Sequence, residues 1–242
     1  MGTTLITGAS GAIGRETARK LAEAGESLYL HFNTGKERVR QIADELSRIY
    51  PNQTFSCIQA DLSVESGTDK LLDQLDGPVT NVVYNCGKSL VGLFQDTTPQ
   101  TVKEFIQLQL TSPFLILQKL IQPMIRVRKG KVIIVSSIWG LTGASTEVLY
   151  SMVKGGQNTF VKALAKEVAP SGISVNAVAP GAVDTPMMNE FDEEDIEQVR
   201  QDIPMGRLAR PEEVASLIRF LITPEADYIS GQVLSINGAW YC

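Results

Sequence analysis

Three side chains in the second half of the chain have the types and the spacing needed to move a proton. Tyr150 and Lys154 are four residues apart, so on a helix they share one face, and Ser137 comes shortly before them. A phenol with an ordinary pKa of about 10 is a poor base at neutral pH. A cation about 4 Å away at an effective dielectric of about 20 contributes ~4 kcal/mol, which corresponds to a pKa about 3 lower. We therefore expect Lys154 to lower the pKa of Tyr150 and to make it a proton carrier for an alkoxide.

A glycine-rich turn near the start of the chain predicts a site for a dinucleotide. The stretch from Thr7 to Gly14 reads TGASGAIG, with an apolar run before it and a helical pattern after it. Glycine and alanine let the backbone approach a pyrophosphate, whose charge is stabilised by the free N–H groups of the helix start. A glycine-rich turn alone can be merely structural, but this position between strand and helix favours cofactor binding.

Apolar runs of strand length alternate with amphipathic helical patterns along the whole chain. Strands this apolar are buried on both faces, and helices between them supply the crossovers that parallel strands require. We therefore predict an α/β fold, a single-domain doubly wound parallel sheet (Rossmann fold) of about seven strands, with a cofactor half at 1–130 and a catalytic and substrate half at 131–242. The predicted strands are Thr3–Ile6, Ser27–Phe32, Thr54–Gln59, Val79–Tyr84, Lys131–Val135, Ser174–Val178 and Val233–Ile236. The predicted helices are roughly Ile13–Ala24, Lys36–Ile49, Thr101–Val127, Leu149–Ala169 and Glu212–Leu221.

Short motifs stand just after the predicted strands, where doubly wound sheets bind their ligands. In chain order they are the turn Thr7–Gly14, Asp61-Leu62, Asn85-Cys86-Gly87, Ser137, Tyr150-x-x-x-Lys154 and Pro180-Gly181. This set resembles the short-chain dehydrogenase/reductase family over nearly the whole chain, and most of all its β-ketoacyl-[acyl carrier protein] reductases. Two positions depart from the family pattern: Ala12 stands at the middle glycine of the turn, and Tyr84 at the first asparagine of an Asn-Asn-Ala-Gly element.

The resemblance implies a role for each matched residue and implies no metal site. Tyr150 gives the proton, Lys154 also holds the nicotinamide ribose, and Ser137 hydrogen-bonds the substrate oxygen. Gln109 stands at the place of a fourth catalytic residue, an asparagine. The residues implied to bind the cofactor are Gly8, Ser10, Gly11, Ala12, Ile13, Gly14, Asn33, Thr34, Asp61, Leu62, Asn85, Gly87, Tyr150, Lys154, Pro180, Gly181, Val183 and Thr185.

The end of the second predicted strand indicates which nicotinamide cofactor is bound. Enzymes that use NAD usually carry an acidic residue there, which accepts a hydrogen bond from the ribose 2′-hydroxyl. Residues 31–34 contain no carboxylate that would repel a 2′-phosphate, while Thr34 and Lys36 can donate to one. Gly11 lacks the basic side chain of many NADP-dependent relatives, and Lys36 and Arg38 can also be only the solvated start of a helix. We predict NADP(H) rather than NAD(H).

Gln109 leaves the proton relay of the family open to two interpretations. The family's asparagine orders a water that carries protons from solvent to the lysine. Glutamine has the same donors and acceptors, but its extra methylene moves them by more than about an ångström. Small displacements at a reacting site cost large factors in rate. Either the relay is rebuilt around Gln109 or the enzyme is slow.

Pro180–Thr185 resembles the nicotinamide clamp of the family, in which Thr185 and the backbone of Val183 bind the carboxamide. Met187, Met188 and Phe191 come next, and they form either a lid over an apolar substrate or a plain core contact. The acidic run at 192–195 is typical of a solvated helix start.

The favoured function is NADPH-dependent reduction of a 3-oxoacyl thioester, linked to acyl carrier protein, to the 3-hydroxyacyl form. An acidic carrier needs a basic docking patch, for which the candidates are Arg126, Arg128, Lys129 and Lys166, although a solvated loop explains these residues equally well. Two alternatives stay open: a family oxidoreductase for a sugar, steroid or small ketone, and a low-turnover NADP-binding protein. The resemblance also implies a homotetramer with one interface along 101–127 and 149–169.

Composition argues against several classes of protein. The chain of 242 residues has 22 Lys and Arg against 27 Asp and Glu, a net charge of −5, which disfavours nucleic acid and membrane surfaces as partners. No apolar run approaches the ~20 residues of a membrane span, and no signal peptide is visible. Cys57, Cys86 and Cys242 lack a zinc spacing and are expected to be reduced thiols of a cytoplasmic protein. His31 is the single histidine, so a Ser-His-Asp unit would depend on it.

Overall fold

Seven parallel strands form one sheet in the computed structural model of the chain, which describes residues 2–190 and 192–241. The order is β3-β2-β1-β4-β5-β6-β7, and every neighbouring pair is parallel. The strands are β1 (Thr3–Thr7), β2 (Ser27–Phe32), β3 (Phe55–Gln59), β4 (Asn81–Tyr84), β5 (Gly130–Val135), β6 (Ile173–Pro180) and β7 (Val233–Ile236). The predicted Rossmann fold is confirmed. The order reverses between β1 and β4, and such a reversal opens a crevice for ligands at the carboxyl ends of the strands.

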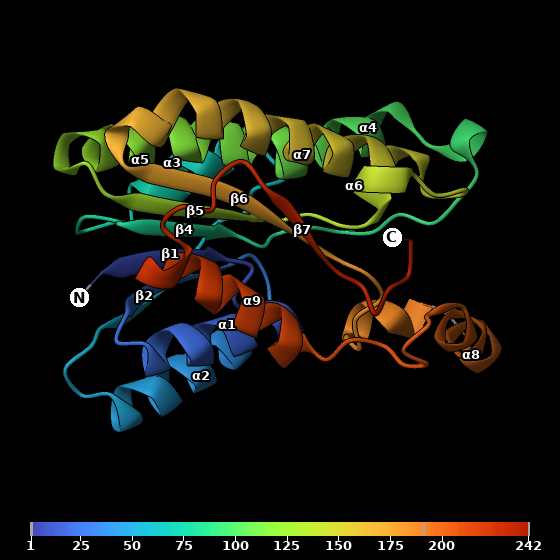
Figure 1. Cartoon of the computed structure of the whole chain (residues 1–242), viewed down its shortest axis with the longest axis horizontal. Helices are drawn as coiled ribbons and strands as arrows, with labels where there is room; N and C mark the ends of the chain where they lie inside the picture. Colours follow the sequence, from blue (N-terminus) through green and yellow to red (C-terminus); the bar gives the residue numbers. More distant parts are fainter. Residues whose placement is uncertain (1, 191, 242) are drawn as a thin grey trace.

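Helices cover both faces of the sheet, as Figure 1 shows. One face carries α1 (Ala12–Glu23), α2 (Lys36–Ile49) and α9 (Pro211–Ile222). The other face carries α3 (Gly67–Leu72), α5 (Ser112–Val127) and α7 (Val148–Val168). The elements α4 (Pro99–Ile106), α6 (Trp139–Thr142) and α8 (Glu193–Asp202) gather toward the carboxyl ends of the strands, at the right of Figure 1.

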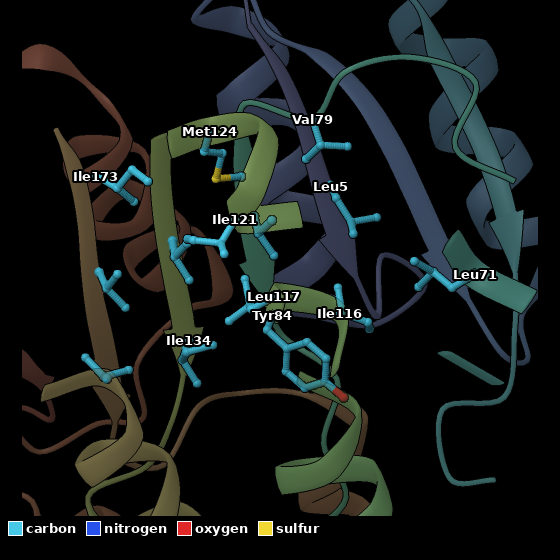
Figure 2. Packing of buried hydrophobic residues seen from close by; sticks show 14 of the residues in the cluster. Leu5, Leu71, Val79, Tyr84, Ile116, Leu117, Ile121, Met124, Ile134 and Ile173 are labelled. Atoms are coloured by element: carbon cyan, nitrogen blue, oxygen red, sulfur yellow. The ribbon is translucent and has the colours of Figure 1, made fainter. Parts of the chain in front are cut away.

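Alternate residues of each central strand belong to opposite cores. Tyr84 and Ile134 pack in the core beneath α5 and α7, whereas Val83 and Ile133, their neighbours in the chain, pack beneath α1 and α9. This is the two-residue period of a strand that is buried on both faces. Figure 2 shows the first of these cores, with Tyr84 and Ile134 among the labelled side chains.

The helix predicted over 101–127 is interrupted. The chain forms α4, then a π-turn at Gln107–Thr111, then α5. The first part also begins earlier, because Thr98 caps it by accepting a hydrogen bond from the N–H of Thr101, and Pro99 occupies the first helical position. The π-turn is a single turn of five residues inside a longer helix, which is too short to show a period of its own in the sequence.

Other local expectations have mixed outcomes. The acidic run does start a helix, since the Asp192 side chain accepts a hydrogen bond from the N–H of Asp195 and α8 follows. The short helices α3 and α6 were not predicted, because six and four residues are too few to show a period. Cys57 and Cys86 are free thiols, and Cys242 lies outside the described residues. Within 2–190 and 192–241, no helix is long and apolar enough to cross a membrane.

Candidate active site

A cavity of about 930 Å³ lies at the carboxyl ends of the strands. Its size and position are those of a ligand site in a doubly wound sheet. It extends from the glycine-rich turn after β1 to the start of α7 and the segment after β6. Of the predicted site residues, all except Gly14 and Gln109 line it: Gly8, Ser10, Gly11, Ala12, Ile13, Asn33, Thr34, Asp61, Leu62, Asn85, Gly87, Ser137, Tyr150, Lys154, Pro180, Gly181, Val183 and Thr185.

The turn after β1 brings backbone N–H groups to the cavity wall. Gly8 has a φ of +68°, in the left-handed region that favours glycine. Gly14 lies behind the turn, where a Cβ would stand 2.2 Å from the carbonyl oxygen of Gly8, so only glycine lets α1 pack this closely. No side chain among the described residues caps α1 at Gly11, which leaves its first N–H groups available to an anion.

His31 and Asn85 brace this turn from behind. His31 is buried; its Nδ1 accepts from the N–H of Gly8 at 3.3 Å, and its Nε2 donates to the carbonyl of Ala60 at 3.1 Å. Burial lowers the pKa of His31 to about 4, so it stays neutral near pH 7 and holds the backbone instead of moving protons. Asn85 Nδ2 donates to the carbonyls of Thr7 and Gly8 at 3.2 Å each.

The outer end of the cavity carries Asn33, Thr34 and Arg38 after β2, and Asp61 after β3. Burial acts to raise the pKa of Asp61, but hydrogen bonds from Ser63 and Asn33 outweigh it, and the pKa lies below its ordinary value. Its charge is therefore engaged by neighbouring donors. Of the two predicted donors, Thr34 lines the cavity and Lys36 does not, whereas Arg38 lines it without having been predicted.

The three residues predicted to move a proton meet at the inner end of the cavity. Ser137 lies in the loop two residues after the end of β5, and its side chain hydrogen-bonds the hydroxyl of Tyr150 near the start of α7. Lys154 lies one turn further along α7, with Nζ 5.5 Å from the centre of the Tyr150 ring. Lys154 is buried, and its Nζ donates to the carbonyl of Val135 at 2.9 Å.

The pKa values of Tyr150 and Lys154 differ from the expected ones. Burial raises the pKa of Tyr150 to about 12; the hydrogen bond from Ser137 lowers it and the charge of Glu147 raises it. Burial also lowers the pKa of Lys154 to about 7. The predicted net lowering of the Tyr150 pKa is therefore wrong for this structure, because desolvation disfavours both the phenolate and the ammonium and outweighs the attraction between them. Tyr150 holds its proton at neutral pH.

Comparison with known proteins identifies the family. The family model described as Enoyl-(Acyl carrier protein) reductase matches residues 8–239. "Uncharacterized oxidoreductase YmfI" of Bacillus subtilis is 50% identical over 99% of both chains. The chain belongs to the short-chain dehydrogenase/reductase family. The resemblance drawn from the motifs is thereby confirmed.

Two more proteins are similar to this chain over almost their full length. 3-Oxoacyl-[acyl-carrier-protein] reductase FabG of Aquifex aeolicus is 35% identical over 98% of this chain and 96% of its own. The crystal structure of the angucycline C-6 ketoreductase LanV with bound NADP superimposes with a TM-score of 0.91 at 27% identity, covering 98% of this chain and 94% of that one.

Gln109, which was predicted to belong to the catalytic site, lies behind the cavity wall in this short-chain dehydrogenase/reductase. It lies in the π-turn, is fully buried and does not line the cavity. Its Nε2 donates to the carbonyl of Lys88 at 3.3 Å, and its Oε1 has no hydrogen-bond partner among the described residues. A Cβ on Gly87 would lie 3.2 Å from Gln109 Oε1 and 3.4 Å from Lys154 Nζ, so Gly87 lets both groups approach one point.

One aromatic wall of the cavity was not predicted from the sequence: Trp139, Trp240 and Tyr241 all line it. Trp139 packs edge-on against Trp240 and Tyr241, with ring centres 5.1 and 5.2 Å apart. The side chain of Trp139 also hydrogen-bonds Glu147. The available signal was that Trp139 stands two residues after Ser137 and that two adjacent aromatics, Trp240 and Tyr241, stand near the other end of the chain. Met187 and Met188 line the cavity nearby, and Phe191 lies outside the described residues.

Proposed function

We propose that this protein reduces a 3-oxoacyl thioester of an acyl carrier protein to the 3-hydroxyacyl form, with NADPH as reductant. The observation that carries the proposal is the convergence of Ser137, Tyr150 and Lys154 on a cavity that also holds a dinucleotide turn. A relative 35% identical over almost all of this chain is named for that substrate.

Ser137, Tyr150 and Lys154 would each have a separate role in the reaction. When bound, NADPH supplies a hydride to the substrate carbonyl carbon. Ser137 and Tyr150 share a hydrogen bond, so both hydroxyls can reach one substrate oxygen, and Tyr150 gives its proton to that oxygen as it becomes an alkoxide. Lys154 holds positive charge one helical turn away, which stabilises the phenolate left behind.

The site also fits NADPH better than NADH. No carboxylate follows β2 among residues 31–38 except Glu37, which does not line the cavity. Thr34 and Arg38 do line it and can donate to a 2′-phosphate. The solved structure of LanV has NADP bound.

Carrier docking needs a second copy of the chain. Arg126, Arg128 and Lys129 stand where β5 begins, about 20 Å from Ser137 at its other end. Arg128 also has a structural role, because it ends α5 in a left-handed conformation and donates to the carbonyl of Pro170 at 2.7 Å. A carrier at this patch would thus stand far from the catalytic residues of the same chain.

A symmetric pair of chains would bring patch and site together. α5 and α7 expose apolar side chains on one surface, among them Phe114, Leu115 and Met152. A two-fold axis across this surface makes the helices of the two chains antiparallel, so the end of one α7, with Lys166, approaches the start of the other, with Tyr150. We propose this contact as one interface of a homotetramer.

One assay tests the proposed substrate. NADPH oxidation is measured with acetoacetyl thioesters of carrier protein and of coenzyme A, and with a panel of sugar, steroid and small ketones. The highest kcat/KM is expected for the carrier thioester, and the variant Tyr150→Phe should lose turnover yet bind NADPH normally. A higher kcat/KM for a ketone of the panel would contradict the proposed thioester substrate. Absence of turnover with every compound tested would instead indicate a protein that binds NADP without catalysis.

A further inference from the structure

The side-chain amide of Gln157 joins Lys154 to the π-turn. Gln157 lies on α7 one turn beyond Lys154, and its side chain is 1% exposed. Its Oε1 accepts a hydrogen bond from Lys154 Nζ at 3.2 Å, and its Nε2 donates to the backbone carbonyl of Gln109 at 2.7 Å. Burying an amide is costly unless both of its ends are paired, and here both are.

The hydrogen bond to Gln157 restricts the orientation of the Lys154 ammonium. An ammonium has three N–H donors. One is used by the carbonyl of Val135 at 2.9 Å and a second by Gln157, both on the protein side of the lysine. The third is left for the cavity, which Lys154 lines beside Tyr150.

The π-turn supplies the carbonyl that Gln157 needs. Such a turn displaces the regular hydrogen-bond ladder of a helix and lets side chains bond to its carbonyls. Two successive carbonyls of this turn bond to buried side chains: that of Leu108 accepts from the Tyr84 hydroxyl, and that of Gln109 accepts from Gln157. Tyr84 and Gln157 thus hold the turn from β4 and from α7.

We propose that Gln157 is a positioning residue for the catalytic lysine: it fixes the direction of the Lys154 ammonium by tying it to the backbone of the π-turn. The contribution of position 109 to Lys154 then runs through its carbonyl and Gln157, and the Gln109 side-chain amide forms no hydrogen bond with the lysine. The inference rests on the proposed function, in which Tyr150 and Lys154 transfer the proton.

Two substitutions at Gln157 and one control test the link. Gln157→Met removes both hydrogen bonds at nearly constant length, and Gln157→Glu keeps an acceptor and adds a charge beside the ammonium. Asn158→Leu is the matched control, because Asn158 is also a buried amide of α7 but donates to the carbonyl of Gly140 at 2.9 Å and not to Lys154. Circular dichroism establishes that each variant is folded.

The first readout is the protonation of Lys154 in the protein without cofactor. Pulse acetylation at a series of pH values, followed by peptide mass spectrometry, gives the midpoint at which the amine becomes reactive. Loss of the Gln157 acceptor disfavours the charged amine, so Gln157→Met should move the midpoint down by about one pH unit. Gln157→Glu should move it up, and Asn158→Leu should leave it unchanged.

The second readout is the pH profile of kcat. In Gln157→Met the alkaline limb should move down with the acetylation midpoint, so that kcat falls about tenfold near pH 8 and recovers near pH 6. A folded Gln157→Met with the midpoint of the unaltered protein overturns the proposal. If that variant does not fold, a midpoint in Gln157→Glu that fails to rise overturns it equally. Activity in Tyr150→Phe would instead refute the proposed function, independently of these midpoints.

Discussion

Arg38 and Ser10 meet across Gly35, although they belong to different turns. A Cβ on Gly35 would lie 2.8 Å from Nη2 of Arg38 and 3.1 Å from Cβ of Ser10. The guanidinium therefore folds back from α2 toward the glycine-rich turn, and both residues line the cavity. Gly11 carries no basic side chain in that turn, and Arg38 brings a positive charge to the same region from the next element along the sheet.

Replacing Arg38 should reduce affinity for NADPH and spare NADH. A charge-assisted hydrogen bond to a phosphate contributes ~1.5–3 kcal/mol, so Arg38→Ala should raise the Kd of NADPH about tenfold to a hundredfold. Fluorescence titration of the two reduced cofactors measures the effect. Arg40→Ala is the control, because Arg40 lies on the same helix but does not line the cavity. Equal losses for NADPH and NADH would contradict the assignment.

Glu147 should oppose the ionisation of Tyr150. Glu147 lies at the start of α7, and its charge raises the pKa of Tyr150. Glu147→Gln should therefore lower that pKa and allow alcohol oxidation, which needs the phenolate, at lower pH. Because the interaction of partly exposed charges is below ~1 kcal/mol, oxidation with NADP⁺ near pH 8 should rise about threefold. Glu147→Asp keeps the charge, and a similar rise in that variant would assign the effect to packing against Trp139.

The sequence revealed the parts of the site that depend on local order. Tyr150 and Lys154 share a face because they are four apart on a helix, and the turn at Gly8 is recognisable because strand, turn and helix are consecutive. The π-turn was not predicted because its five residues are too few to show a period of their own. Gln157 and Arg38 were not predicted because their roles depend on tertiary contacts. The sequence alone does not show whether a glutamine is buried or whether an arginine at a helix start lines a cavity. The pKa of Tyr150 was predicted with the wrong sign for the same reason, since burial is a tertiary property.

Lys154 should make the protein less stable at low pH. Its pKa falls from 10.5 when exposed to about 7 in the folded chain. A lowered lysine pKa means that the folded state binds the proton more weakly, so the cost is fully present below pH 7 and disappears above about pH 10.5. Lys154→Met should thus raise Tm at pH 6, lose the gain as pH rises, and abolish turnover. Thermal unfolding of Lys119→Met, an exposed lysine of α5, should show no such dependence.

A methyl group should be costly at Gly14 and tolerated at Gly11, although both residues belong to the glycine-rich turn. A Cβ on Gly14 would stand 2.2 Å from the carbonyl oxygen of Gly8, so α1 would have to move away from the turn. Gly14→Ala should cost about 1–3 kcal/mol in the free energy of unfolding and weaken NADPH binding, because the N–H groups of α1 move as well. Gly11 has an ordinary φ of −77° and its Cβ would meet its nearest neighbour at 3.4 Å, so Gly11→Ala should fold normally. Urea unfolding and cofactor titration of the two variants measure both effects. Equal stability of Gly14→Ala and Gly11→Ala would show that the close packing of α1 on the turn is not needed.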